Sequence, residues 1–179
     1  PGGGSAAALA GALAAALGQM VANLTVGRKK YAKVEGDIRA ALERLERAAG
    51  RLGSLAVDDS AAFDELMKAH KAGGDDETAK QAGVQRATVH AAAVPLEVAD
   101  TCAELMEDLA LLAAQGNPNA RTDAQVGAYL AHAAVMGACL NIAVNVEGIA
   151  DEAERQRFGD AVARLRREAA ERLARIVGA

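Results

Sequence analysis

Apolar residues recur along this chain in alternating steps of three and four, the spacing that places them on one side of an α-helix. The longest such row consists of Ile38, Leu42, Leu45, Ala49, Leu52, Ala56, Phe63 and Leu66. Similar rows run through 84–112, 126–144 and 158–176, and no segment has the two-residue period of a strand. The pattern therefore predicts an all-α protein.

Five helices are expected, over 6–27, about 38–71, 78–114, 123–147 and 149–179. The first is an uncharged, Ala-rich run with Ser5 as its expected N-cap, and a helix that is apolar on all sides is expected to be buried. The sequence Gly73-Gly74-Asp75-Asp76 predicts a break before a helix that starts at Glu77. The third helix keeps its phase through Pro95, so this proline is expected to kink it without ending it. Residues 1–179 thus suit a single-domain, up-and-down bundle of about five long helices.

The fourth helix follows a turn at 115–119, and a capping box of Thr122 and Gln125 is expected to start it. One of its faces carries an apolar row from Val126 to Val144, and a neighbouring face carries mostly small residues with the two amides: Gly127, Ala134, Ala138, Asn141, Asn145 and Gly148. The last helix, rich in arginine, is expected to bury a row from Phe158 to Ile176.

One acid, Asp59, falls within the row 38–66. Burying an unpaired carboxylate is costly, so an acid on the packed side of a helix is a candidate functional group. The alternative is that Asp58 or Asp59 caps a helix that begins after a break at Gly50 and Gly53. Because the seven-residue spacing continues across both glycines, the pattern favours one unbroken helix with Asp59 buried. Asp58 lies off the row and is expected to face solvent.

The composition narrows the possible functions. Half the residues are hydrophobic but only 2% are aromatic, and 18 are Gly, which indicates helices packed at close approach. The formal charge of −4 argues against nonspecific nucleic-acid binding. Cys102 and Cys139 form no CxxC pair, which favours a reducing compartment, and the three scattered histidines predict no metal site. The run 6–27 lacks the basic start of a signal peptide and is too rich in Ala, Gly and polar residues for a typical membrane span.

Three further groups are candidate ligand contacts. Backbone N–H groups of Gly2-Gly3-Gly4-Ser5, at a helix start, can bind a polar ligand edge, although flexible glycine-rich starts are common. The run Arg28-Lys29-Lys30 can bind an anionic tail or simply end a helix favourably. Asn141 and Asn145, one turn apart, can contact a ligand or bond to an adjacent helix.

In combination, motifs along the chain resemble the cyclodeaminase/cyclohydrolase family. They are Pro1-Gly2-Gly3-Gly4-Ser5, the run 20–31, Asp58-Asp59-Ser60-Ala61-Ala62-Phe63, Val94-Pro95-Leu96, Gly116-Asn117 with Thr122-Asp123, and Asn141-Ile142-Ala143-Val144-Asn145. The resemblance covers essentially the whole chain in order. Family members have a further helical segment before the Pro-Gly-Gly-Gly, so part of the site or of the dimer surface is expected in a segment before Pro1.

The resemblance implies an all-helical, dimeric, folate-dependent enzyme. One branch, methenyltetrahydrofolate cyclohydrolase, hydrolyses 5,10-methenyltetrahydrofolate to 10-formyltetrahydrofolate. The other, formiminotetrahydrofolate cyclodeaminase, releases ammonia and is often fused to a formiminotransferase. The run 23–31, the Asp58-Asp59 pair and the lack of a transferase domain are closer to the cyclohydrolase branch. A non-catalytic helical interaction module is the remaining alternative.

The same resemblance assigns roles to individual residues. The family's catalytic aspartate matches Asp59, with Asp58 as the alternative. The substrate-binding candidates are Gly2, Gly3, Gly4, Ser5, Arg28, Lys29, Lys30, Asn117, Asp123, Asn141 and Asn145. We expect a cytoplasmic homodimer that binds a folate derivative, which can carry several glutamates. No cofactor beyond the tetrahydrofolate substrate, no metal, no nucleic acid and no membrane is expected.

Overall fold

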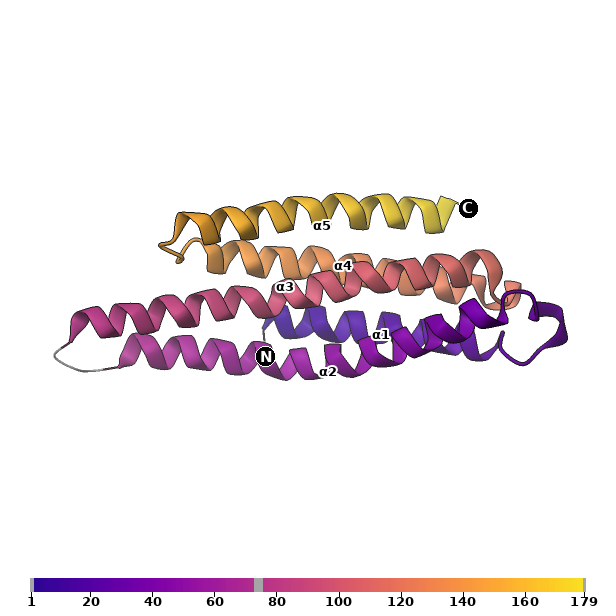
Figure 1. Cartoon of the computed structure of the whole chain (residues 1–179), viewed down its shortest axis with the longest axis horizontal. Coiled ribbons are helices and arrows are strands. Elements are labelled where there is room, and N and C mark those ends of the chain that lie inside the picture. The colour runs from indigo at the N-terminus through magenta and orange to yellow at the C-terminus, as the bar shows by residue number, and fades with distance from the viewer. Residues whose placement is uncertain (1, 73–75, 179) are drawn as a thin grey trace.

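The structure, a computed structural model, describes residues 2–72 and 76–178 and places them in five long helices. These are α1 (Gly3–Asn23), α2 (Glu35–Lys71), α3 (Glu77–Gln115), α4 (Arg121–Val146) and α5 (Glu152–Gly178), with 3-10 turns at Lys29–Tyr31 and Pro118–Ala120. Successive helices run in opposite directions along one elongated bundle (Figure 1). The described residues contain no strand. The predicted all-α, up-and-down bundle of five helices is therefore confirmed.

Helix α2 is unbroken at Gly50 and Gly53, as the continuous apolar row predicted. Its 37 residues extend for about 55 Å at about 1.5 Å per residue. The row buries Ile38, Leu45 and Leu52 completely. Because α2 packs against both α1 and α3, these side chains form the centre of the core.

The ends of α2 and α3 agree with the sequence pattern. Helix α2 ends at Lys71, and α3 begins at Glu77 after Asp76, whose carboxylate accepts a hydrogen bond from the N–H of Ala79. The predicted break at Gly73-Gly74-Asp75 lies outside the described residues. Pro95 lies inside α3 without ending it. The predicted inner row of α5 is also present, since Phe158, Leu165, Ala169 and Ile176 are buried.

Two predicted helix caps are wrong. Helix α1 begins at Gly3, so Ser5 lies in its first turn, and its hydroxyl donates to Asp59 instead of accepting a hydrogen bond from the helix backbone. Helix α4 begins at Arg121, so Thr122 lies inside it, and no side chain caps this helix. Gln125 instead donates its amide to the carbonyl of Ile176 at the end of α5. In both cases a contact with another helix replaces the expected local bond.

The burial of α1 differs from the prediction, and the structure shows which of the two faces of α4 packs inward. Helix α1 is buried on one side only, with Leu9 54% and Leu13 60% exposed. In α4 the small residues Gly127, Ala134 and Ala138 are buried, and the row of larger residues faces outward. The close approach of the two helices explains this choice, because a Cβ on Gly127 would lie 3.3 Å from the carbonyl oxygen of Ala14.

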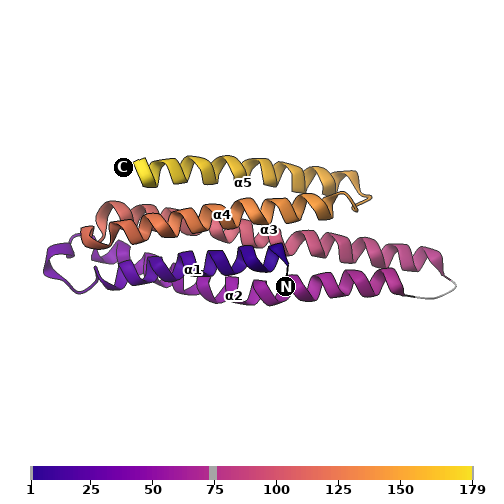
Figure 2. The same ribbon diagram turned by 180° about the vertical axis from the view of Figure 1, so that it is seen from behind.

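The outward side chains form what we call the α1/α4 face. It consists of Leu9, Leu13, Met20, Leu24, Val126, Tyr129, Leu140 and Val144, all exposed. Figure 2 shows α1 and α4 side by side with no other helix in front of them. By length and composition alone, Gly3–Asn23 and Pro118–Val146 could also cross a membrane, with 50% and 44% of their most apolar windows buried in the bundle. The bundle therefore leaves a large apolar surface without a partner.

An ion pair between the half-exposed Arg44 of α2 and the buried Asp108 of α3 gives a test of stability. The Asp108 side chain is 8% exposed and accepts hydrogen bonds from Arg44 Nε at 3.0 Å and Nη2 at 2.6 Å. We expect Arg44→Ala to lower the free energy of unfolding by about 1–3 kcal/mol, because it leaves a buried carboxylate unpaired. The measurement is urea unfolding followed by circular dichroism.

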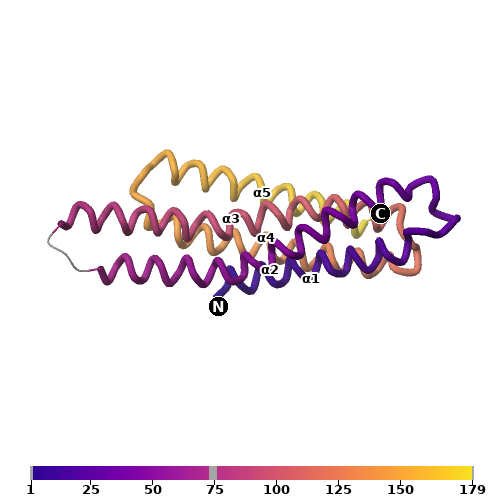
Figure 3. Tube along the Cα trace, turned by 60° about the horizontal axis from the view of Figure 1, so that its bottom comes forward, coloured from indigo at the N-terminus to yellow at the C-terminus, as the bar shows by residue number. Residues whose placement is uncertain are grey.

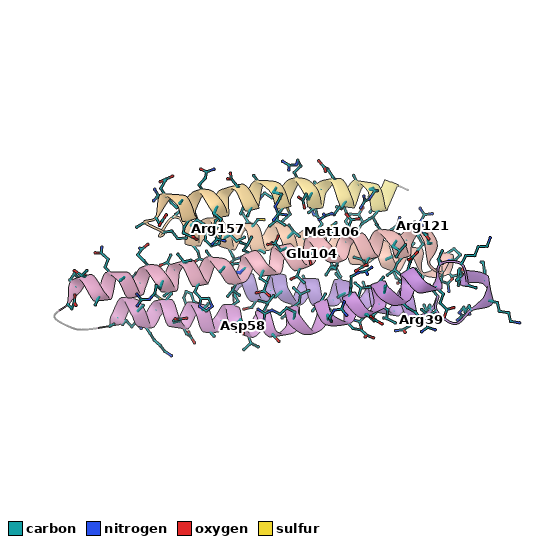
Figure 4. All side chains as sticks on the ribbon, in the orientation of Figure 1. Arg39, Asp58, Glu104, Met106, Arg121 and Arg157 are labelled. Carbon is teal, nitrogen blue, oxygen red and sulfur yellow. The ribbon has the colours of Figure 1, made fainter. Side chains whose placement is uncertain are left out.

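The matched control is Arg39→Ala. Arg39 lies near the start of α2 (Figure 4), with its side chain 56% exposed, and pairs with Glu35 one turn away. Such an exposed pair contributes about 0.5 kcal/mol or less. Equal losses in the two variants would show that the Arg44 pair has no special role in the core.

Candidate active site

A cavity of about 800 Å³ lies at the N-terminal end of α1. Helix α1 begins part-way along the bundle, whereas α2 and α3 continue beyond its first residue (Figures 1 and 3). The cavity is lined by Gly2, Gly3, Asp59, Ser60, Phe63, Asp64, Ala91, Leu140, Asn141, Val144 and Asn145. It thus lies between α2, α3 and α4, next to the first residues of α1. At this level of the bundle α1 does not fill the space between the other three helices.

Asp59 is the acid of this cavity. Its Oδ2 accepts two hydrogen bonds from Ser5, one from the backbone N–H and one from the hydroxyl, each 2.8 Å long. Its Oδ1 accepts none from the described part of the chain. One oxygen is therefore fixed in position by Ser5, and the other, which lies next to Gly4, has no hydrogen-bond donor among the described residues.

Asp59 is only half-buried, so the expectation that it would be fully enclosed is wrong. Phe63, one turn further on, was also expected to be buried because it continues the apolar row, yet it is 59% exposed. Both residues lie where α2 passes the end of α1. The inward side of α2 faces the cavity there instead of a packed helix.

The glycines before Ser5 allow the start of α1 to approach two functional side chains. A Cβ added at Gly4 would overlap the carboxylate of Asp59. One added at Gly3 would lie 2.9 Å from Nδ2 of Asn141, whereas one added at Gly2 would meet nothing within 4 Å. Close approach therefore requires glycine at two of these three positions.

Asn141 and Asn145 form the α4 wall of the cavity. The Asn141 amide donates to the carbonyl of Gly137 at 2.9 Å, and the Asn145 amide donates to the carbonyl of Ala91 on α3 at 2.7 Å. The bond to an adjacent helix, which was the alternative to a ligand contact, is thus present at Asn145. Neither Oδ1 accepts a hydrogen bond among the described residues. Each Asn can therefore accept a hydrogen bond from a ligand while its amide keeps the side chain in place.

The other predicted binding residues lie at the opposite end of α1. Arg28, Lys29 and Lys30 follow that helix, whose 21 residues extend for about 30 Å. Asn117 stabilises the neighbouring turn, since its amide donates to the carbonyl of Leu24 and its Oδ1 accepts from the N–H of Asn119. Asp123 lies in the first turn of α4. Within one chain, none of these five residues lines the cavity with Asp59.

Asp58, the alternative catalytic acid, does not line this cavity. Its carboxylate pairs with Arg51 at 3.1 Å, and its side chain is 45% exposed, as the sequence pattern predicted. Arg51 also binds Glu97, and His90 pairs with Glu65, so these residues form an exposed network along the edge of α2 and α3. Hydrogen bonding to Glu97 raises the pKa of Arg51 above its ordinary value.

Several cavity residues were not identified from the sequence. Ser60 lies beside Asp59, and its hydroxyl is 3.3 Å from that of Ser5. Asp64 lies just over one helical turn beyond Ser60, so helical spacing would have suggested it only once Ser60 had been identified. Leu140 and Val144 belong to the apolar row of α4, and no sequence signal distinguished a cavity wall from a packed core.

Comparison with known proteins shows which proteins this chain is similar to. The family model described as formiminotransferase-cyclodeaminase matches residues 1–164. A methenyltetrahydrofolate cyclohydrolase of Methylorubrum extorquens is 40% identical over 156 residues, which cover 86% of this chain and 75% of the relative. A formimidoyltransferase-cyclodeaminase of Sus scrofa is 34% identical over 172 residues, or 94% of this chain but 32% of the pig protein. The chain therefore spans about a third of that longer relative.

A solved structure is similar over almost the whole fold. The crystal structure of a formiminotetrahydrofolate cyclodeaminase from Thermotoga maritima has a TM-score of 0.91 and 32% sequence identity, and the match covers 98% of this chain and 85% of that one. Proteins named for the hydrolysis and for the deamination reaction thus both resemble this chain over most of its length.

Proposed function

The chain belongs to the formiminotransferase-cyclodeaminase family, and on that premise we propose that it hydrolyses 5,10-methenyltetrahydrofolate to 10-formyltetrahydrofolate, with Asp59 as the catalytic proton carrier. The family membership confirms the resemblance inferred from the sequence. The observation that carries the proposal is the position of Asp59, which lines a cavity with one carboxylate oxygen held by Ser5 and the other without a hydrogen-bond donor among the described residues. The cyclohydrolase relative, at 40% identity, favours this branch.

The reaction requires one proton to leave a water molecule and one to reach N5 of the substrate. Water adds to the cationic bridge carbon while Oδ1 of Asp59 takes its proton, which gives a neutral hydroxylated ring. Asp59 then returns this proton to N5 as the bond between carbon and N5 breaks. The hydroxyl loses its proton to solvent as the formyl C=O forms, so the overall reaction releases one proton. A single carboxylate therefore suffices for both transfers.

The surrounding residues position the reactants. The N–H and hydroxyl of Ser5 fix the orientation of the Asp59 carboxylate. Asn141 and Asn145 can accept hydrogen bonds from the amino groups of a pterin ring, and the backbone at Gly2 and Gly3 can receive a polar edge of the ligand. Holding water and substrate in one geometry contributes to the rate independently of proton transfer.

The second candidate reaction is cyclodeamination, which the structural likeness to the Thermotoga maritima enzyme favours. In that case N10 attacks the formimino carbon and Asp59 protonates the departing ammonia. The same cavity and the same acid serve both reactions, so the choice depends on which substrate is turned over.

A pair of assays tests these proposals. The first follows loss of the methenyl absorbance, and the second follows ammonia released from 5-formiminotetrahydrofolate. We expect the enzyme to accelerate the first reaction beyond its uncatalysed rate. Acceleration of the second alone would replace hydrolysis with deamination. Acceleration of neither would favour the non-catalytic interaction module.

The protein is further proposed to act as a cytoplasmic homodimer, joined through the α1/α4 face. The support is the row of large apolar side chains on this face, of which Leu13 is 60% and Val144 is 71% exposed. Contiguous apolar surfaces of this kind are typical of subunit interfaces.

We expect Leu13→Asp to weaken self-association at least about 100-fold, because it places an unpaired charge in the interface. Size-exclusion chromatography with light scattering measures the effect. Ala163→Asp, on the exposed side of α5, is the control and should leave the dimer unchanged. A Leu13→Asp protein that remains dimeric would exclude this face as the interface.

A further inference from the structure

Asp64 is the second carboxylate of the Asp59 cavity, and the mechanism given above does not use it. It lines the cavity from α2, is exposed, and has no hydrogen-bond or ion-pair partner among the described residues. The other acids of this part of α2 are engaged. Asp59 accepts hydrogen bonds from Ser5, and Asp58 and Glu65 form ion pairs outside the cavity. The carboxylate of Asp64 is therefore exposed to whatever enters the cavity.

The charged and amide groups of the cavity wall present hydrogen-bond acceptors. The amides of Asn141 and Asn145 donate to protein carbonyls, whereas neither Oδ1 accepts a hydrogen bond from the described part of the chain. The described residues that line the cavity include two carboxylates and no Arg, Lys or His. The wall is therefore complementary to a ligand that presents N–H groups or a positive charge.

Two adjacent N–H groups are bound best by a carboxylate, because its two oxygens accept two parallel hydrogen bonds at once. A pterin ring has such a pair at N3 and the 2-amino group. Asp59 cannot offer both oxygens, since its Oδ2 already accepts two hydrogen bonds from Ser5. Of the described residues that line the cavity, this leaves Asp64. The oxygens of Asn141 and Asn145 then remain for the other N–H groups of the ring.

The spacing of the two acids suits the two ends of that ring. Asp59 and Asp64 are five residues apart on α2, which corresponds to about 7.5 Å along the helix axis. In the pterin ring, the amino edge lies at the end opposite to N5, where the bridge carbon is attached. A ring bound by Asp64 therefore extends along α2 with its reacting end toward Asp59. Its flat faces can pack against apolar lining residues, which are Phe63, Leu140 and Val144.

We propose that Asp64 determines specificity for the pterin ring, with its two carboxylate oxygens accepting hydrogen bonds from N3–H and the 2-amino group. Asp64 takes no part in proton transfer. It selects the ring that enters the cavity and directs the bridge carbon toward Asp59. The identity of this ligand rests on the function proposed above.

The test combines a variant of the protein with an altered substrate. Methenyltetrahydrofolate, and an analogue in which a methyl group replaces the 2-amino group, are each offered to the unchanged protein and to Asp64→Ala. With the analogue, the unchanged protein should lose at least about tenfold in kcat/KM, because hydrogen bonds to a charged group are lost. Asp64→Ala should lose a similar factor with the natural substrate, and at most about threefold more with the analogue. If Asp64→Ala discriminates between the two substrates as strongly as the unchanged protein does, the proposal is overturned.

Glu65→Gln is the matched control. It removes the same charge from the next residue, which pairs with His90 and does not line the cavity. We expect it to leave kcat/KM unchanged for both substrates. An equal loss in Glu65→Gln would mean that negative charge in this region attracts the cationic substrate without a specific contact, which also contradicts the proposal. Thermal unfolding checks that Asp64→Ala, which truncates an exposed side chain, folds as the unchanged protein does.

Binding measurements separate a failure of this inference from a failure of the proposed reaction. The stable reduced folate 5-formyltetrahydrofolate is titrated into the unchanged protein and into Asp64→Ala in a calorimeter. If the unchanged protein turns over neither folate substrate, the proposed function fails. A Kd that is still at least about tenfold higher in Asp64→Ala would then support Asp64 as the residue that binds the ring. An equal Kd in the two proteins, or no binding to either, would overturn the inference.

Discussion

Replacing Asp59 by Asn is expected to lower kcat at least about 100-fold without loss of the fold. Asn has nearly the same shape, and its single oxygen can still accept a hydrogen bond from Ser5, as Oδ2 does now. It cannot take a proton from water at neutral pH, so the first step of hydrolysis loses its base. The measurements are kcat with saturating methenyl substrate and urea unfolding of the same preparation.

Asp58→Asn is the matched control. It removes a carboxylate from the neighbouring position, where the side chain pairs with Arg51 and lies outside the cavity. We expect an activity close to that of the unchanged protein. If Asp58→Asn loses activity and Asp59→Asn does not, the assignment of the catalytic acid is wrong.

Asp59→Leu shows how far the acid also stabilises the fold. It should abolish turnover, and because the buried N–H and hydroxyl of Ser5 lose their acceptor, it should also lower the free energy of unfolding, by about 1–3 kcal/mol. The alternative given by the sequence is that Asp59 caps a helix of its own. The uninterrupted course of α2 through this residue already argues against a cap.

The fold was predictable because the rows of apolar residues are long and hold a single phase. The row that starts at Ile38 continues through two glycines, and the row of α3 continues through Pro95. A break would have shifted the phase of the residues that follow it. The same regularity identified Asp59, the acid in an otherwise apolar row.

The two sides of α1 and α4 could not be told apart by the same reasoning. Large apolar residues such as Leu13 and Val126 are equally suited to the core of one chain and to an interface between two chains. The small residues Gly127 and Ala134 gave no apolar signal, yet they are buried, because close helix packing excludes larger side chains. Hydrophobicity alone therefore does not show which face of α4 packs inward, and it overestimated the burial of α1.

The cavity depends on where helices end relative to one another. It exists because α1 starts at Gly3 while α2 and α3 continue past that point (Figure 1). The apolar pattern of one helix does not show where a neighbouring helix begins, so the cavity could not be predicted from it. The motifs that resemble the family include Asp59, Asn141 and the glycines, which lie together at the cavity. They also include Arg28 and Asn117, which the length of α1 keeps far from that cavity.

Replacing Gly4 by Ala is expected to lower kcat about 100-fold, because a displacement of the order of 1 Å at a catalytic group can have this effect. The added Cβ would overlap the Asp59 carboxylate, so Asp59 must move or α1 must shift. Either change disturbs the hydrogen bonds from Ser5 that fix Oδ2. The variant should still fold, since Ala favours a helix more than Gly does.

Gly53→Ala provides the control, because a Cβ at that exposed position of α2 would meet nothing within 4 Å and the residue does not line the cavity. The two variants add the same methyl group to a helical glycine, so a loss of activity at Gly4 alone would arise from crowding of the acid. Equal activity in both would mean that Asp59 does not need its present position. In that case the close approach of α1 to α2 would serve packing rather than catalysis, and the role of Asp59 as proton carrier would have to be abandoned.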